Sequence, residues 1–194
     1  MVGPKRILIV VGVPGVGKTT VIKKVETLLN KSGDKNSVVV FGTIMLSEAK
    51  KMGISDRDDI RKLNVNEQKE LQNKASDYIR TIKDELIIVD THLFIRTPSG
   101  FLPGIPENVI KKLKPTNLVL ITASPEEILE RRATDNSRDR DMLSIEDINR
   151  ELDLARSMIS TISILSSAPF EIVSNRSNML ESASNRILEI LTRA

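Results

Sequence analysis

Residues 12–20 read Gly12-Val13-Pro14-Gly15-Val16-Gly17-Lys18-Thr19-Thr20, a glycine-rich stretch between two apolar segments. The segment before it, residues 5–11, is apolar and β-branched, which predicts a strand buried on both faces. The segment after it carries apolar residues at the spacing of one helix face, namely Val21, Ile22, Val25, Leu28 and Leu29. The stretch is therefore expected to be a loop that joins a buried strand to an amphipathic helix.

The loop fits the pattern G-x-x-x-x-G-K-[ST] and predicts a phosphate-binding site rather than a chance glycine-rich turn. Its glycines let the backbone adopt positive φ and come close to a ligand. The N–H groups at the start of the following helix favour an anion. We expect residues 12–20 to bind a polyphosphate, with Lys18 at the β and γ phosphates and the Thr19 hydroxyl at Mg²⁺.

The composition excludes several classes of protein. The chain has 194 residues, no cysteine and a formal net charge of +3, so disulfides and thiolate zinc sites are ruled out. The scarcity of aromatic residues, 3% in all, argues against single-stranded nucleic acid as a ligand. No apolar run is long enough to cross a membrane or to serve as a signal peptide. We therefore expect a cytoplasmic enzyme, with neither membrane nor nucleic acid as a partner.

Strand and helix patterns alternate along the chain. After the first strand, buried strands are predicted at residues 38–41 and 86–90, and two more strands are predicted at residues 118–121 and 170–173. Helices are predicted between them at residues 43–52, 56–63, 66–83, 108–113, 124–135, 144–168 and 177–192. Residues 97–106 contain three prolines and two glycines, which predicts a structured loop rather than a strand. The alternation predicts one α/β domain over residues 1–194, with a five-stranded parallel sheet between two layers of helices.

The helix predicted at residues 144–168 carries two apolar faces. One contains Ile148, Leu152 and Ile159, and the other contains Leu154 and Met158. Two such faces indicate either burial on both sides or one face against the core and the other against a partner subunit. The sequence leaves these alternatives open.

Two residues at the end of the 86–90 strand are candidates for the same site. Asp90 ends an apolar strand, as an acid that holds Mg²⁺ directly or through water would do, although it could simply cap the strand. His92, the only histidine, follows at once, and either touches a substrate or has a structural role. In a parallel sheet both would lie at the strand ends where ligands bind.

Arginines follow three of the predicted strands. They are Arg57 and Arg61, Arg96, and the group Arg131, Arg132, Arg138 and Arg140. Each group could be a solvated face balanced by nearby aspartates. Guanidinium groups, however, match phosphate oxygens, and phosphoryl transfer needs mainly alignment and dispersed positive charge. Arginines from several segments therefore suggest an enzyme that joins two nucleotides.

Four segments, taken in order, resemble the archaeal-type adenylate kinases. They are GVPGVGKTT at 12–20, DRDDIRKL at 56–63, DTHLFIRTPSGFLPGIP at 90–106 and SRDRD at 137–141. The resemblance runs from the first strand to the last helix, and the 90–106 segment is more selective than the phosphate loop. It implies a three-layer P-loop kinase fold, with a small AMP-binding helical insertion at about 42–83 and a short lid at about 134–143.

The resemblance also implies the reaction ATP + AMP = 2 ADP with Mg²⁺, and a homotrimer. It assigns ATP binding to residues 12–20 and Arg131, and metal binding to Thr19 and Asp90. It assigns catalysis to Lys18, Arg96, Arg138 and Arg140. AMP binding falls to Gly42, Thr43, Arg57, Arg61 and Arg96.

The chain departs from the pattern of many bacterial relatives at two places. Residues 43–50 contain no arginine, which leaves the AMP phosphate to Arg57, Arg61 and Arg96. The lid is too short for the long form that sometimes binds zinc. The alternatives to an adenylate kinase are a kinase for another nucleoside monophosphate, a kinase for a hydroxyl acceptor with Asp90 as base, and a nucleotide-dependent switch protein.

Overall fold

The computed structural model describes residues 5–97, 100–134 and 144–192. The strands are β1 (Arg6–Val11), β2 (Asn36–Val40), β3 (Leu86–Asp90), β4 (Phe94–Thr97), β5 (Gly100–Pro103), β6 (Asn117–Thr122) and β7 (Phe170–Ser174). The helices are α1 (Lys18–Ser32), α2 (Phe41–Lys50), α3 (Arg57–Lys62), α4 (Val65–Thr81), α5 (Glu107–Leu113), α6 (Pro125–Thr134), α7 (Ile145–Ser166) and α8 (Leu180–Thr192).

The main sheet has five strands in the order β2-β3-β1-β6-β7, and every pair is parallel. The strands β1, β3 and β6 are the central ones, and nearly all of their residues are buried. This explains their continuous apolar sequences, because a central strand of a parallel sheet is covered on both faces. The predicted five-stranded parallel sheet is confirmed.

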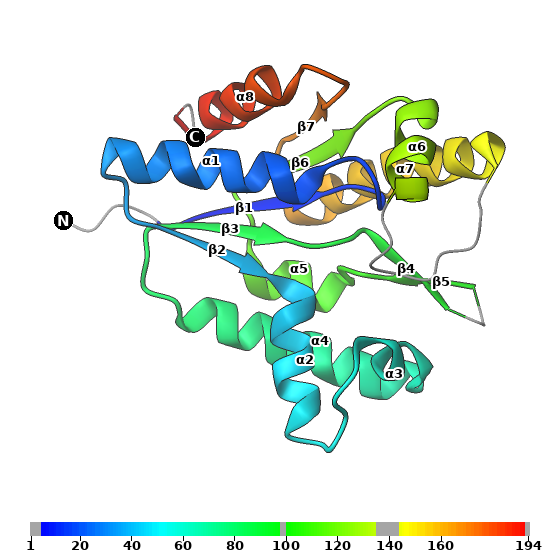
Figure 1. The fold of residues 1–194 in the computed structure, drawn as a ribbon. Helices are drawn as coiled ribbons and strands as arrows, with labels where there is room; N and C mark the ends of the chain where they lie inside the picture. Colours follow the sequence, from blue (N-terminus) through cyan, green and yellow to red (C-terminus); the bar gives the residue numbers. More distant parts are fainter. Residues whose placement is uncertain (1–4, 98–99, 135–143, 193–194) are drawn as a thin grey trace.

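Helices cover the sheet on both faces (Figure 1). α1 and α8 contact each other on one face, while α5 contacts α4 and α7 on the other. Within the part of the chain that the structure describes, no helix is long and apolar enough to cross a membrane. The carboxyl ends of β1, β3 and β6 meet at one edge of the sheet, so the loops that follow these strands are brought together there.

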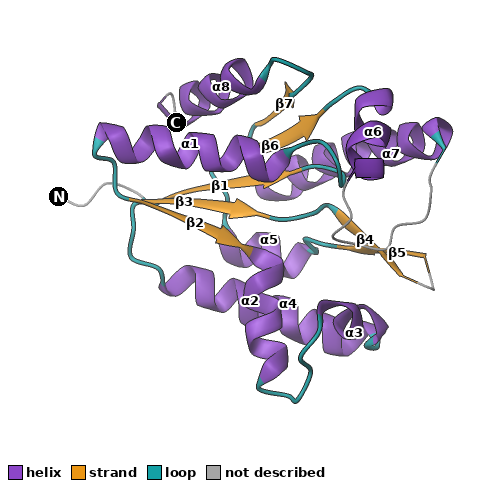
Figure 2. Cartoon of the chain, viewed as in Figure 1, coloured by secondary structure: helices purple, strands orange, loops and turns teal. Residues whose placement is uncertain are grey.

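The loop prediction for residues 97–106 was partly wrong. β4 and β5 form a separate antiparallel hairpin, in which Arg96 lies opposite Phe101 (Figure 2). Phe94 and Phe101 pack edge to face, with ring centroids 4.9 Å apart. The hairpin tolerates Pro103 because a two-stranded ribbon leaves a strand's outer edge unpaired. The turn signals in this segment therefore mark the hairpin's ends rather than a loop without strands.

The segment after β2 is helical from its first residue. Phe41 was predicted to end the second strand, but it begins α2 and is buried there. Its aromatic side chain packs into the core from the helix. A buried apolar residue fits a helix as well as a strand, so apolar character alone did not distinguish the two. The predicted AMP-binding segment, about 42–83, forms α2, α3 and α4, and α2 packs against α4.

Candidate active site

The phosphate loop needs glycine for two separate physical reasons. Gly15 and Gly17 have φ of 91° and 80°, a region that other residues rarely adopt. In addition, a Cβ on Gly12 would lie 2.8 Å from the carbonyl oxygen of Ile121, and a Cβ on Gly17 would lie 2.5 Å from the side-chain nitrogen of Asn175. The loop therefore depends both on its own conformation and on close packing against the segments at the ends of β6 and β7.

The start of α1 is suited to an anion. Its N-cap residue is Gly17, which brings no side-chain acceptor to the first turn, and that turn contains no acidic residue. The helix dipole adds partial positive charge at the same place. Thr19 is exposed on this first turn. The backbone of residues 17–20 thus forms the kind of helix terminus at which phosphates bind.

Lys18 and Asp90 form a buried ion pair. Their side chains are 9% and 7% exposed. The pairing follows from the sheet, because Asp90 lies beside Val10 in the register of β1 and β3, and Lys18 begins the helix that follows β1. The sequence prediction that both residues belong to one site agrees with this contact, and their roles toward phosphate and metal stay predictions.

Thr19 and Asp90 offer oxygen ligands of the kind that Mg²⁺ prefers. A hydroxyl and a carboxylate are hard donors, and Mg²⁺ usually takes one or two protein ligands together with substrate phosphates and waters. Among the described residues there is no group of three or more His, Cys, Asp and Glu that could hold a metal. The donor set therefore fits a metal that enters with a nucleotide rather than one held in an all-protein cage.

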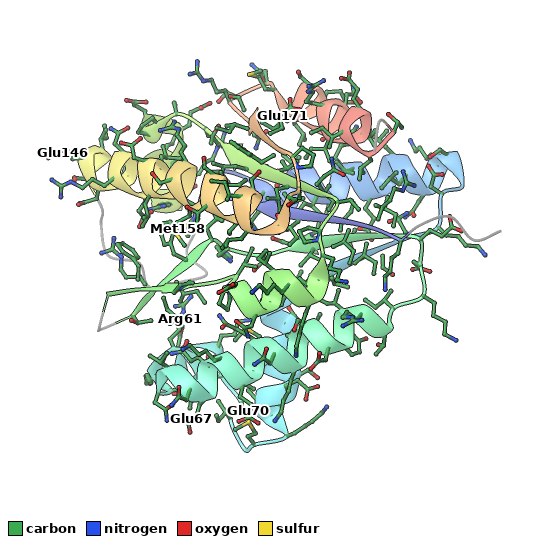
Figure 3. All side chains as sticks on the ribbon, turned by 180° about the vertical axis from the view of Figure 1, so that it is seen from behind. Arg61, Glu67, Glu70, Glu146, Met158 and Glu171 are labelled. Carbon is green, nitrogen blue, oxygen red and sulfur yellow. The ribbon has the colours of Figure 1, made fainter. Side chains whose placement is uncertain are left out.

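Three of the predicted AMP-binding residues gather at the start of α2. Gly42 and Thr43 lie in its first turn, and the Thr43 hydroxyl accepts a hydrogen bond of 2.6 Å from the guanidinium of Arg57. A Cβ on Gly42 would meet no heavy atom within 4 Å, so the space beside it is open. Arg61, which Figure 3 shows on α3, pairs instead with Asp58 of its own helix at 3.0 Å. The structure therefore joins Arg57 to Thr43 and turns the Arg61 guanidinium toward Asp58.

Arg96 lies on β4, and its guanidinium has two neighbours. It pairs with Glu151 of α7 at 3.2 Å, and it lies 5.2 Å from the centre of the Phe101 ring. The side chain is 53% exposed. An arginine held at two sides in this way keeps free area toward solvent from which to contact a ligand.

His92 lies beside the phosphate loop. With Phe94 it lines a small hollow whose opposite wall includes Gly12 and Pro14. The backbone here is tightly packed, since a Cβ on Gly104 would fall 2.1 Å from the carbonyl oxygen of His92. The position is compatible with both roles that the sequence left open.

Arg131 connects the phosphate loop to the segment after β7. Its guanidinium donates to the carbonyl oxygen of Asn175 at 3.2 Å and to that of Val16 at 3.4 Å. The Asn175 amide donates to the same Val16 oxygen at 2.8 Å. Arg131 is thus placed at the loop, as predicted, although its binding of ATP remains a prediction.

Glu127, at the start of α6, also connects this helix to the segment after β7. It accepts hydrogen bonds from the hydroxyl and the backbone N–H of Ser177 and from those of Ser124. These bonds lower the pKa of Glu127 to about 2, and the bond from the Ser177 hydroxyl has the largest effect. Glu127 therefore closes a capping box with Ser124 and also links α6 to the β7–α8 segment.

Sequence reasoning missed four residues that surround the loop, namely Glu127, Arg132, Glu151 and Asn175. Arg132 was seen only as one of a cluster of arginines, yet its Nε donates to the carbonyl oxygen of Pro14 at 2.9 Å. Asn175 follows a predicted strand, and this position was a usable signal. Glu151 gave none, because one acid in a long helix looks like any other. The lid arginines, Arg138 and Arg140, lie outside the described residues.

Replacing Gly17 with alanine should weaken ATP binding by at least about tenfold, because the new Cβ would meet Asn175 and displace the loop. Gly53→Ala is the matched control, since Gly53 has φ of 83° but no heavy atom within 4 Å of the added Cβ. Both variants should lose about 1–2 kcal/mol of stability to the positive φ. Calorimetric titration measures the affinity for ATP, and urea denaturation measures the stability. Equal ATP affinities of Gly17→Ala and Gly53→Ala would contradict the expectation.

The pKa of Glu127 predicts a dependence of stability on pH. Because the folded-state pKa of about 2 lies below the ordinary value of 4.5, the bonds of Glu127 stabilise the fold fully above about pH 4.5. This contribution should be lost progressively as the pH falls toward 2. Urea denaturation between pH 5 and pH 3 should show a smaller loss in Glu127→Gln than in the parent, whereas the exposed neighbour variant Glu126→Gln should follow the parent. Identical slopes in Glu127→Gln and the parent would contradict the prediction.

Comparison with known proteins identifies the family to which this chain belongs. Residues 11–149 match a family model described as an AAA domain. The chain is 41% identical over 188 residues to an adenylate kinase of Methanocaldococcus jannaschii, covering 96% of this chain and 98% of the relative. It is 40% identical over 191 residues to an adenylate kinase of Pyrococcus furiosus, covering 97% and 96% of the two chains.

Solved structures share the fold at much lower identity. A shikimate kinase from Bacteroides thetaiotaomicron superposes with a TM-score of 0.60 at 13% identity, covering 96% of this chain and 98% of the other. A shikimate kinase from Aquifex aeolicus gives 0.53 at 20% identity, covering 96% of both chains. These likenesses concern the fold alone. The identity to the archaeal relatives extends over nearly the whole chain, and it shows that this protein belongs to the adenylate kinase family.

Proposed function

We propose that the protein transfers the γ phosphoryl group of ATP to AMP, giving two molecules of ADP. Two observations support this beyond the family. The phosphate loop is complete, and a series of contacts leads from it to Arg96, through Arg132 and Glu151. The second observation carries the proposal, because an enzyme that joins two nucleotides needs positive charge on both sides of the transferred group.

The backbone of residues 12–20 and Lys18 would bind the phosphates of ATP. Lys18 would contact phosphate oxygens in place of Asp90. Thr19 and Asp90 would hold Mg²⁺, which would supply positive charge to offset that of the phosphates. Each of these groups lies on a rigid element, since Lys18 and Thr19 are in α1 and Asp90 ends β3.

The phosphate of AMP would act as the nucleophile without a general base. Its second pKa is near ~6, so it is largely ionised at neutral pH. The protein's part is then to align two anions and to offset their charge. Gly42, Thr43, Arg57, Arg61 and Arg96 would bind AMP, and Arg138 and Arg140 would close over the transferred group.

We further infer a cytoplasmic homotrimer. Support for the assembly comes from an exposed apolar surface at the end of α7 and along β7. Glu171 points toward α8, where it pairs with Arg186, so Phe170 and Ile172 point to the opposite face of this edge strand. They are 39% and 44% exposed, and Ile164 and Leu165 on α7 are 81% and 46% exposed. Exposed apolar residues of this kind are typical of a subunit interface.

Lys18→Ala should lower the rate of ADP formation by at least about a thousandfold, since the lysine would stabilise charge that develops during transfer. The control is Lys112→Ala, which removes an exposed lysine paired with Asp77. A coupled assay with ATP and, in turn, AMP, CMP, UMP and shikimate should show AMP as the preferred acceptor. Activity with the hydroxyl acceptor alone, or an unchanged rate in Lys18→Ala, would refute the assignment.

Ile164→Asp should convert the assembly to monomers, because it places a charge in the proposed apolar interface. Light scattering after size-exclusion chromatography should give the parent a mass of about three times 21.6 kDa. The control Val65→Asp alters another exposed apolar residue, on α4, and should leave the mass unchanged. A parent that elutes as a 21.6 kDa monomer would refute the trimer.

A further inference from the structure

Glu151 is a buried acid that joins two arginines from different parts of the chain. It lies in the second turn of α7, and its side chain is 8% exposed. One carboxylate oxygen accepts from Arg132 of α6 at 2.8 Å, and the other accepts from Arg96 of β4 at 3.2 Å. Each oxygen of the carboxylate thus accepts from a different guanidinium group.

Arg132 fixes this carboxylate relative to the phosphate loop. Its side chain is also 8% exposed, and its Nε donates to the carbonyl oxygen of Pro14 at 2.9 Å. Its stem lies close to the loop as well, since a Cβ on Gly15 would be 3.1 Å from Arg132 Cγ. The Nε of the guanidinium therefore holds the loop, while its Nη2 holds Glu151.

Arg96 is the exposed end of the series. It is half exposed, and a long arginine side chain has many rotamers to choose from. Glu151 on one side and the Phe101 ring on the other restrict that choice. Because Glu151 is itself fixed to Arg132, the position of Arg96 is tied to the position of Pro14 in the loop.

We propose that Glu151 is a positioning residue that sets Arg96 at a fixed place relative to the phosphate loop, so that Arg96 is ready to bind the AMP phosphate. The inference rests on the proposed function, since it takes Arg96 to be a ligand of AMP. Glu151 itself touches neither nucleotide. Its carboxylate also offsets the repulsion between two guanidinium groups that would otherwise avoid each other.

The chemistry of the side chain predicts which variants matter. Glu151→Gln keeps the shape but replaces one acceptor oxygen with an NH₂ group, so one arginine would face a donor instead of an acceptor. Glu151→Asp keeps the charge but is shorter by one methylene, and it should restore part of the function. Glu171→Gln is the control, because Glu171 also pairs with an arginine through both oxygens but lies near the amino end of β7.

The experiment measures the affinities of AMP and ATP separately by calorimetric titration of the full chain, together with thermal unfolding. Glu151→Gln should weaken the binding of AMP by about tenfold, which is the effect of losing one charge-assisted hydrogen bond. ATP affinity should change by less than about twofold. Glu151→Asp should lie between the parent and Glu151→Gln, and Glu171→Gln should bind both nucleotides as the parent does.

A double-mutant cycle with Arg96→Ala decides whether Glu151 acts through Arg96. The double variant should bind AMP no more weakly than Arg96→Ala alone. The proposal would be overturned if the losses of AMP affinity in the two single variants added up in the double variant. It would also be overturned if Glu151→Gln weakened the binding of AMP and ATP equally, or changed only the thermal stability. If Glu151→Gln does not fold, Glu151→Asp enters the same cycle. A parent protein that forms no ADP from ATP and AMP would instead refute the proposed function.

Discussion

The close approach of backbone segments around the phosphate loop is the constraint on which the rest of the site depends. The loop passes so near Ile121 and Asn175 that a side chain at Gly12 or Gly17 would collide with them. This packing fixes the start of α1 relative to the ends of β6 and β7. Asp90 ends β3, and Lys18 begins the helix that follows the neighbouring strand β1. Both residues therefore lie at the same edge of the sheet, where they pair.

Four of the described cationic groups around the loop are each matched by a carboxylate. Lys18 pairs with Asp90, Arg131 lies 3.6 Å from Glu127, and Arg132 and Arg96 share Glu151. Without these carboxylates, the lysine and the arginines would repel one another, and their long side chains would be poorly ordered. The acids hold these groups in place, and a half-exposed group such as Arg96 keeps free area from which it would contact a nucleotide phosphate.

The sequence was a good guide wherever a local pattern has one physical cause. Continuous apolar runs predicted the strands of the parallel sheet, and the helices predicted to begin at residues 124 and 144 do begin there, each capped by its serine. It was a poorer guide where two structures share one pattern. Prolines and glycines in residues 97–106 indicated a loop but belong to the β4–β5 hairpin, and apolar Phe41 indicated a strand but begins α2.

By itself the sequence determined the phosphate loop, the order of strands and helices, and the arginines that follow the strands, because spacing and residue type are local properties. Only the tertiary structure decided which partners those residues have. Nothing in residues 144–168 distinguishes Glu151 from the other acids of that helix, and nothing in the loop predicts that Pro14 is held by Arg132. Such contacts depend on how α6, α7 and β4 pack together, which is a property of the whole fold.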